Sequence, residues 1–179
     1  MTDDGARQPV SGATRLAAVI GDPVRHSLSP TLHNAGFAAL GLDWIYVALP
    51  VSADDGLEAV HAARLLGIDG LSVTMPHKQA VAETVDELTP LAEALGAVNC
   101  VQRVGDRMIG HNTDGTGFVR SVQAQMGFEA AGGAVALVGA GGAASAVATA
   151  LCAAGAEVKV INRSHDRAAA LADVAGPRC

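Results

Sequence analysis

Residues 134–145 read AVALVGAGGAAS, and residues 157–163 read EVKVINR; together these stretches decide the fold. A short apolar run ends in a glycine-rich turn and continues into an alanine-rich stretch with a helical pattern. This order is the setting of the G-x-G-x-x-(G/A) pattern, because residues 158–161 add a second strand at the spacing of a βαβ unit. The pattern alone is weak in a chain with 21 glycines, but its context makes it a strong indication of a dinucleotide site.

The small residues of this turn have separate expected roles. Gly139 permits the tight turn, Gly141 lets the backbone approach a pyrophosphate, and Ala144 lets the helix pack near the strand. The residues expected to contact the cofactor here are Gly139, Ala140, Gly141, Gly142 and Ala143.

The end of the second strand indicates which dinucleotide is bound. An acid there would receive the ribose 2′-hydroxyl of NAD, but this chain has Asn162, Arg163 and Ser164, with Arg167 one turn later. A guanidinium group binds a phosphate where a carboxylate would repel it, so we predict NADP. The alternative is that both arginines are ordinary surface residues at the start of a helix.

Composition bounds the class of protein. The 179 residues are 50% hydrophobic and 3% aromatic, which predicts a core of small aliphatic side chains in one domain or two small ones. A net charge of −6 without a basic run argues against nucleic acid as a partner, and glycine or charge interrupts every long apolar stretch before it could span a membrane. Three scattered cysteines and a polar N-terminus predict a reducing cytoplasm.

Strands and helices are expected to alternate along the chain. The expected strands are residues 16–20, 44–49, 70–73, 97–104, 108–109 and 158–161 and the run before Gly139, and the expected helices are residues 29–40, 54–66, 88–95, 114–126 and 165–174, with a further helix starting at Thr74.

This alternation predicts an α/β fold with a mostly parallel sheet. We expect a flexible leader at residues 1–14, an N-terminal α/β substrate domain at residues 15–113, and the first half of a Rossmann NADP-binding domain at residues 114–179. A complete dinucleotide-binding domain has two βαβαβ halves, so the sequence is interpreted as a fragment or a truncated product that lacks the nicotinamide-binding half.

Two segments of the first domain carry hydroxyl groups and a lysine. In residues 21–34, GDPVRHSLSPTLHN, Ser27 and Ser29 lie at an expected helix N-terminus, a suitable place for a carboxylate. The alternative is that Ser29 simply caps the helix. In residues 72–78, SVTMPHK, Lys78 lies in an expected first helical turn, where the helix dipole disfavours a cation by about 0.3–1 kcal/mol. A destabilised ammonium suits proton transfer, and the alternative is a solvated lysine.

Two further segments carry amide and carboxylate groups. Residues 96–100, GAVNC, contain Asn99, and residues 110–115, GHNTDG, contain Asp114 at the junction of the two expected domains. Each alone is more typical of a turn. A lysine, a carboxylate and several hydroxyl or amide groups ahead of an NADP-type fold together suit the reduction of a carbonyl group.

These segments resemble the shikimate dehydrogenases over nearly the whole chain after the leader. The family patterns G-x-P-x-x-H-S-x-S-P-x-x-H-N, N-V-T-x-P-x-K, G-A-V-N-T, N-T-D-G, G-A-G-G-A and N-R-(S/T) occur here in the same order. Two positions depart from them, because Ser72 replaces the common asparagine and Cys100 replaces the usual threonine.

The resemblance implies reduction of 3-dehydroshikimate to shikimate with NADPH, in aromatic amino-acid biosynthesis. It implies that Ser27 and Ser29 hold the substrate carboxylate. It gives Lys78 the role of acid and base, with Asp114 orienting it as the second member of the catalytic pair. The residues that it implies for the ring hydroxyls are Thr74, Asn99 and Asp114.

Other functions stay open at this point. A quinate/shikimate or aminoshikimate-type dehydrogenase would reuse the same pocket, although Arg163 counts against NAD. A non-catalytic ligand-binding module is the alternative from another class, and we expect little or no dehydrogenase activity from these 179 residues alone. The histidines show no zinc spacing, so no metal is expected. The expected partner is a small-molecule substrate, without nucleic acid or membrane, and a homodimer is left open.

Overall fold

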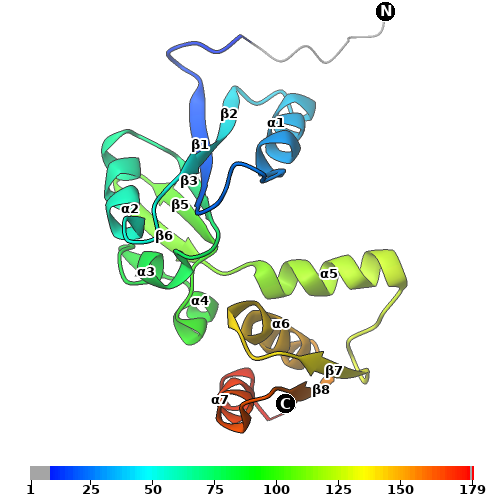
Figure 1. The fold of residues 1–179 in the computed structure, drawn as a ribbon. Helices are drawn as coiled ribbons and strands as arrows, with labels where there is room; N and C mark the ends of the chain where they lie inside the picture. The colour runs from blue at the N-terminus through cyan, green and yellow to red at the C-terminus, as the bar shows by residue number, and fades with distance from the viewer. Residues whose placement is uncertain (1–8, 178) are drawn as a thin grey trace, which may run out of the picture. The chain divides into compact units, whose positions relative to one another are not determined.

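The computed structural model describes residues 9–177 and 179; residues 1–8, most of the expected leader, lie outside the described part. The chain forms two compact units, Met1–Thr89 with Ala97–His111, and Pro90–Gly96 with Asn112–Cys179 (Figure 1). A turn at residues 11–14 precedes the first strand, and its Thr14 hydroxyl donates to Asp43 at 2.7 Å. The last residues of the expected leader therefore form this turn.

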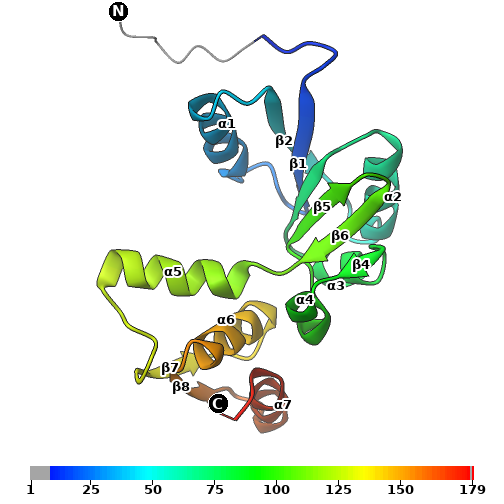
Figure 2. The same cartoon turned by 180° about the vertical axis from the view of Figure 1, so that it is seen from behind.

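A six-stranded sheet forms the centre of the first unit. The strands are β1 (Arg15–Gly21), β2 (Trp44–Pro50), β3 (Gly70–Val73), β4 (Glu87–Leu88), β5 (Cys100–Val104) and β6 (Arg107–His111). Their order in the sheet is β2-β1-β3-β5-β6-β4, and among these described strands β5 alone runs against its neighbours (Figure 2). The predicted α/β fold with a mostly parallel sheet is confirmed.

Three helices accompany this sheet: α1 (Ser29–Ala39), α2 (Gly56–Leu65) and α3 (Lys78–Ala82). Phe37 of α1 packs against buried side chains of the two neighbouring strands, Val19 of β1 and Tyr46 of β2. The helix expected from Thr74 begins only at Lys78, since residues 75–77 form a turn.

A second expectation about helices was also wrong. The helix predicted for residues 88–95 begins at Pro90, as α4 (Pro90–Leu95). Leu88 instead belongs to the two-residue strand β4, where it pairs with Gly110 of β6. The division into units also places α4 with the second unit, whereas the sequence placed it in the first domain.

The second unit contains one βαβ element and its flanking helices. After α5 (Asp114–Met126) come β7 (Ala134–Val138), α6 (Gly142–Ala153), β8 (Glu157–Ile161) and α7 (His165–Ala175). β7 and β8 pair in parallel, as the glycine-rich turn predicts. Small and aliphatic side chains such as Ala148, Leu151, Val158 and Leu171 form the buried core of this unit.

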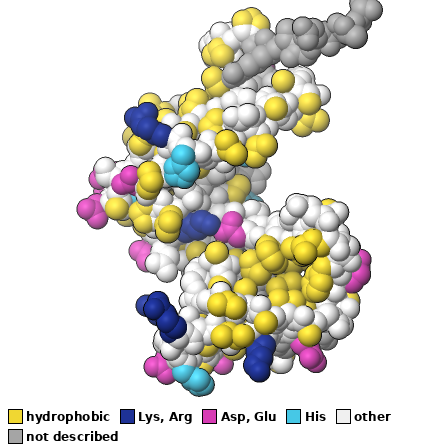
Figure 3. All heavy atoms as spheres, turned by 45° about the vertical axis from the view of Figure 1, so that its right-hand side comes forward, with side chains coloured by type: hydrophobic (Ala, Val, Ile, Leu, Met, Phe, Trp, Pro, Cys, Tyr) yellow, Lys and Arg dark blue, Asp and Glu magenta, His cyan; other side chains and the backbone are white. Residues whose placement is uncertain are grey.

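Hydrophobic side chains also reach the surface of the second unit (Figure 3). An apolar hollow is lined by Phe118, Val122, Met126, Phe128, Val135 and Leu151. None of the helices in the described residues is both long and apolar enough to cross a membrane.

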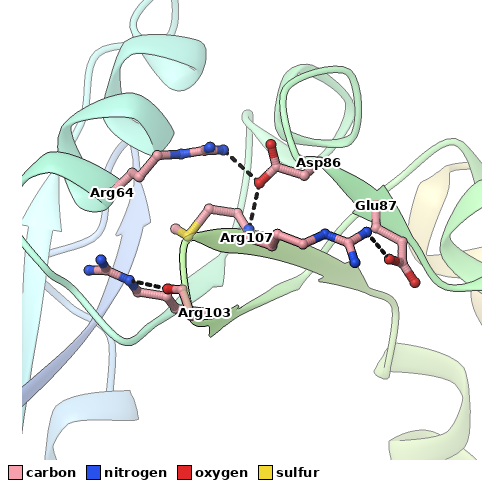
Figure 4. A network of polar contacts seen from close by, with 7 residues as sticks. Arg64, Asp86, Glu87, Arg103 and Arg107 are labelled. Carbon is pink, nitrogen blue, oxygen red and sulfur yellow. Dashed lines mark hydrogen bonds and ion pairs between the residues drawn. The ribbon is translucent and has the colours of Figure 1, made fainter.

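Ion pairs lie at the edge of the first sheet that is formed by β4 and β6 (Figure 4). Asp86 accepts hydrogen bonds from the backbone N–H of Met108 at 2.6 Å and from Arg64 of α2 at 2.7 Å, while Arg107 pairs with Glu87. The bond from Met108, followed by that from Arg64, lowers the pKa of Asp86 below its ordinary value. The short strand β4 is thus linked to β6 by backbone pairing and by the Arg107–Glu87 ion pair, and the residue before it, Asp86, forms an ion pair with α2.

Candidate active site in the first unit and cofactor turn in the second

Backbone hydrogen bonds place two of the predicted substrate residues, Thr74 and Asn99, at one edge of the first sheet. The Thr74 N–H donates to Ile20 of β1 at 3.0 Å, and the Val73 N–H donates to the Asn99 carbonyl at 2.8 Å. Because β5 is antiparallel to β3, its amino end and Asn99 lie beside the carboxyl end of β3. The carboxyl edge of an open α/β sheet is the usual place for a ligand.

Lys78 joins this group through its own carbonyl. The Val98 N–H donates to the Lys78 carbonyl at 2.8 Å, so the residue before Asn99 is bonded to the residue that begins α3. The helix has only five residues, however, so few aligned peptide dipoles act on Lys78. The dipole argument made from the sequence is therefore weaker than expected, and the location of Lys78 at the ligand edge carries its assignment.

His77 fixes the turn that precedes Lys78, a role that sequence reasoning missed. Its ring is 1% exposed, and its Nε2 lies 3.0 Å from the Val51 carbonyl oxygen. Gly56 at the start of α2 is packed against the same ring, because a Cβ there would lie 2.8 Å from Nδ1. The one signal in the sequence was Gly56 at the start of a helix, but nothing in the sequence linked this glycine to a histidine 21 residues later.

The two serines lie together at the start of α1. Ser27 Oγ accepts from the Ser29 N–H at 3.2 Å and lies 3.1 Å from Ser29 Oγ. The capping alternative for Ser29 was wrong, since the helix begins at Ser29 and its N-cap residue is Leu28, which has no side-chain acceptor. No side-chain capping bond forms at the N-cap of α1, and both hydroxyls lie at the positive end of this helix.

Tyr46 is a second residue that the sequence analysis did not single out. It is 4% exposed, and its hydroxyl lies 2.6 Å from Ser72 Oγ. His33 stacks on its ring at 4.3 Å, and the Asn34 side chain bonds both its N–H and its carbonyl. Burial raises the pKa of Tyr46, and the bond with Ser72 offsets part of that rise.

Asp114, the other predicted catalytic residue, is the first residue of α5 and belongs to the second unit. Its N–H donates to Asn112 Oδ1 at 3.2 Å, which is the turn-forming role expected of an asparagine before a helix. Gly115 follows, and a Cβ there would lie 2.1 Å from the Ala146 carbonyl oxygen of α6. The glycine of this segment is thus required by the close packing of α5 on α6.

The glycine-rich turn lies between β7 and α6. Gly139 has φ +114°, which strongly favours glycine, and its N–H donates to the Ile161 carbonyl at 2.9 Å. Gly141 and Gly142 have no such constraint, and a Cβ at either would meet nothing within 4 Å. Ala140 and Ala144 pack partly buried against the core of this unit, and Ala143 lies in the exposed first turn of α6.

The four residues predicted to select NADP line one open pocket after β8. These are Asn162, Arg163, Ser164 and Arg167. Ser164 caps α7 by accepting from the Arg167 N–H at 3.4 Å, and Asn162 Nδ2 donates to the Ser164 carbonyl at 2.9 Å. Both arginines are exposed, so their guanidinium groups are accessible to an anion.

The described residues contain no group of three or more histidine, cysteine or acidic side chains that could hold a metal ion. The three cysteines, Cys100, Cys152 and Cys179, are free thiols.

Comparisons with known proteins find similarity in both units of the chain. The family model described as shikimate dehydrogenase substrate binding domain matches residues 19–101, and the model described as shikimate / quinate 5-dehydrogenase matches residues 122–178. A shikimate dehydrogenase (NADP(+)) of Geobacter metallireducens is 48% identical over 159 residues, which are 88% of this chain and 56% of that protein. The chain thus spans little more than half the length of this relative.

Solved structures give the same result. Shikimate 5-dehydrogenase from Thermus thermophilus, in complex with NADP(H) and shikimate, matches with a TM-score of 0.83 and 40% identity, over 90% of this chain and 60% of that one. A 5-ketofructose reductase of Gluconobacter matches with a TM-score of 0.84 and 34% identity, over 92% of this chain and 59% of that one. On these matches, which extend across both units, the chain belongs to the shikimate dehydrogenase family.

Proposed function

We propose that the full-length protein carrying this chain reduces 3-dehydroshikimate to shikimate with NADPH. The observation that carries the proposal is the grouping of Thr74, Lys78 and Asn99 by backbone bonds at the carboxyl edge of the first sheet. Relatives such as the protein of Geobacter metallireducens, 48% identical over 159 residues, are named shikimate dehydrogenase (NADP(+)), which supports this choice of substrate and cofactor.

The residues of the second unit fit NADP. The missing Cβ atoms of Gly141 and Gly142 leave room for a pyrophosphate, and the pocket after β8 offers Arg163 and Arg167 to a 2′-phosphate. At the end of β8, where a carboxylate would exclude that phosphate, the chain has Asn162. The chemistry that NADPH supplies when bound is hydride transfer to the carbonyl carbon.

The chain's own residues bind the substrate and move one proton. Ser27 and Ser29 bind the carboxylate, since both hydroxyls lie at the amino end of α1. Lys78 donates a proton to the carbonyl oxygen as that oxygen becomes a hydroxyl, and takes it back in the reverse reaction. The resemblance adds Asp114 as the second member of the catalytic pair. Thr74 and Asn99 hold the remaining ring hydroxyls.

The test is the reduction of 3-dehydroshikimate by the full-length protein and by its Lys78→Ala variant. We expect kcat to fall about 100-fold or more in the variant, because general acid catalysis is lost, while shikimate binding is retained. Lys159→Ala is the matched control, since Lys159 is the other lysine of the chain and lies exposed on β8. Equal turnover by Lys78→Ala and Lys159→Ala would refute the role of Lys78.

A quinate dehydrogenase is the second candidate, because the model matched to residues 122–178 covers shikimate and quinate enzymes together. Activity with quinate and NAD that exceeds activity with shikimate and NADP would favour it.

The three free thiols support a reducing compartment such as the cytoplasm, and a homodimer stays a prediction.

A further inference from the structure

The phenol ring of Tyr46 crosses a neighbouring strand to reach Ser72. In the sheet register Tyr46 of β2 lies beside Ala17 of β1, and Ser72 of β3 lies beside Val19 of β1. Side chains alternate along a strand, so Ala17, Val19 and both polar residues share one face. Ala17 has only a methyl group, which leaves room for the ring above β1. The Tyr46 hydroxyl then lies 2.6 Å from Ser72 Oγ.

The ring is held from the α1 side. Asn34 Nδ2 donates to the Tyr46 carbonyl at 2.8 Å, and Asn34 Oδ1 accepts from the Tyr46 N–H at 2.9 Å. His33 lies stacked on the ring with an interplanar angle of 15°. The last two residues of the segment 21–34, which also contains the serine pair, therefore fix the position of the tyrosine.

Ser72 lies next to the proposed substrate residues. Ser72 lies in β3, and Thr74 directly follows the last residue of this strand, so both lie at its carboxyl end. Cys100 is its cross-strand partner and offers only a weakly hydrogen-bonding thiol. Within the described part of the chain, Tyr46 is the one hydrogen-bond partner of the Ser72 hydroxyl. A serine hydroxyl that accepts from a tyrosine keeps its own proton to donate elsewhere.

We propose that Tyr46 is a positioning residue for the substrate: it donates to Ser72 Oγ and so directs the Ser72 proton toward a ring oxygen of the bound shikimate. This inference rests on the proposed function and adds to it. It also explains how Ser72 can bind the substrate at a position where the family commonly has the longer asparagine, because the bond from Tyr46 fixes the direction of the short serine side chain.

The test is a double-mutant cycle in the full-length protein, with shikimate affinity measured by titration calorimetry. We expect Tyr46→Phe, which keeps the ring, to weaken binding about three- to tenfold, the value of one ordinary hydrogen bond. In a Ser72→Ala background the same substitution should cause no further loss. The KM for 3-dehydroshikimate should rise with the dissociation constant while kcat changes less than about twofold.

Thr14→Val is the matched control, since it removes another hydroxyl with a 2.7 Å bond, at the opposite edge of the sheet. Its shikimate affinity should equal that of the unsubstituted protein. An equal loss from Tyr46→Phe in both backgrounds, or no loss in either, would overturn the inference and leave the proposed function intact. Failure of the unsubstituted protein to bind shikimate would overturn both.

Discussion

The glycines near the two candidate sites differ in the space around their Cβ positions. Near the first site, a Cβ on Gly21 would lie 2.4 Å from Thr74 Cγ2, and one on Gly56 would lie 2.8 Å from the His77 ring. In the cofactor turn, Gly141 and Gly142 would meet nothing within 4 Å. The first pair is required by the protein's own packing, whereas the second pair faces open space.

The difference separates structural glycines, which the packing requires, from glycines that neither the packing nor the backbone conformation requires. Gly141 belongs to the second class, since its φ of −97° and ψ of −179° are an extended conformation open to any residue. Gly115, though it lies in a segment with a proposed catalytic residue, belongs to the structural class because it faces the α6 backbone.

The largest effect is expected where a glycine faces backbone. Gly115→Ala should lower the free energy of unfolding by about 3 kcal/mol, since the new methyl would lie 2.1 Å from the Ala146 carbonyl oxygen and α5 must move. Chemical denaturation measures this. Gly117→Ala on the same helix is the control and should stabilise by about 0.5–1 kcal/mol, because its Cβ meets nothing. Equal effects of the two substitutions would remove the distinction.

In the cofactor turn, a methyl group added to a glycine is expected to change ligand affinity rather than stability. Gly141→Ala should leave the unfolding free energy within about 0.5 kcal/mol of its original value, since neither sterics nor backbone conformation opposes a methyl group. NADPH binding should weaken about tenfold or more, because an added methyl in a close contact costs about 1–3 kcal/mol. Fluorescence titration with NADPH measures this, and unchanged affinity would show that no ligand approaches Gly141.

A pH titration tests the environment of Tyr46 in the first unit. Because burial raises its pKa, the phenol should ionise above the ordinary value near 10. The folded state then holds the proton more tightly than the unfolded state. Its stabilising contribution is thus complete below about pH 10 and is lost as the pH rises from there through the folded pKa. The absorbance difference between the protein and Tyr46→Phe isolates this group, and a midpoint at or below the ordinary value would contradict the burial.

The smallest effect concerns the exposed pair of Arg15 and Asp69 at the amino edge of the first sheet. The bond from Arg15 at 2.7 Å lowers the pKa of Asp69, so its contribution is present above about pH 4 and is lost as the pH falls through the lowered pKa. Arg15→Met should raise the Asp69 pKa toward its ordinary value and cost less than about 1 kcal/mol. NMR titration of Asp69 measures the shift, and Arg120→Met on α5 should leave it unchanged.

Local pattern predicted most of the elements but not every boundary. Helix α5 and strand β3 have the predicted bounds. Asn112 and Gly127 flank the helix, and Gly70 and Pro76 mark the two ends of the strand, so the local sequence indicates where each element begins and ends. Strand β4 was missed because two residues carry no periodicity, and its pairing with β6 is decided by the tertiary fold. The reversed direction of β5 likewise depends on which strand it meets.

The site was predicted through its polar motif residues and missed where contacts are distant in sequence. Lys78, Thr74 and Asn99 stood out because they lie in short polar segments, and backbone bonds made by these residues or their chain neighbours link the segments. Tyr46 and His77 did not stand out, since an aromatic residue in a strand and a histidine before a lysine are ordinary in composition. Their roles depend on Ser72 and Val51, each 26 residues away along the chain.

The most direct test of the account is the cofactor preference of the full-length protein with 3-dehydroshikimate, measured as kcat/KM for NADPH and for NADH. We predict reduction with a preference for NADPH of about tenfold or more, because hydrogen bonds to a charged phosphate are worth about 1.5–3 kcal/mol. Arg163→Ala should reduce that preference. No reduction with either cofactor, or a preference for NADH, would contradict the account.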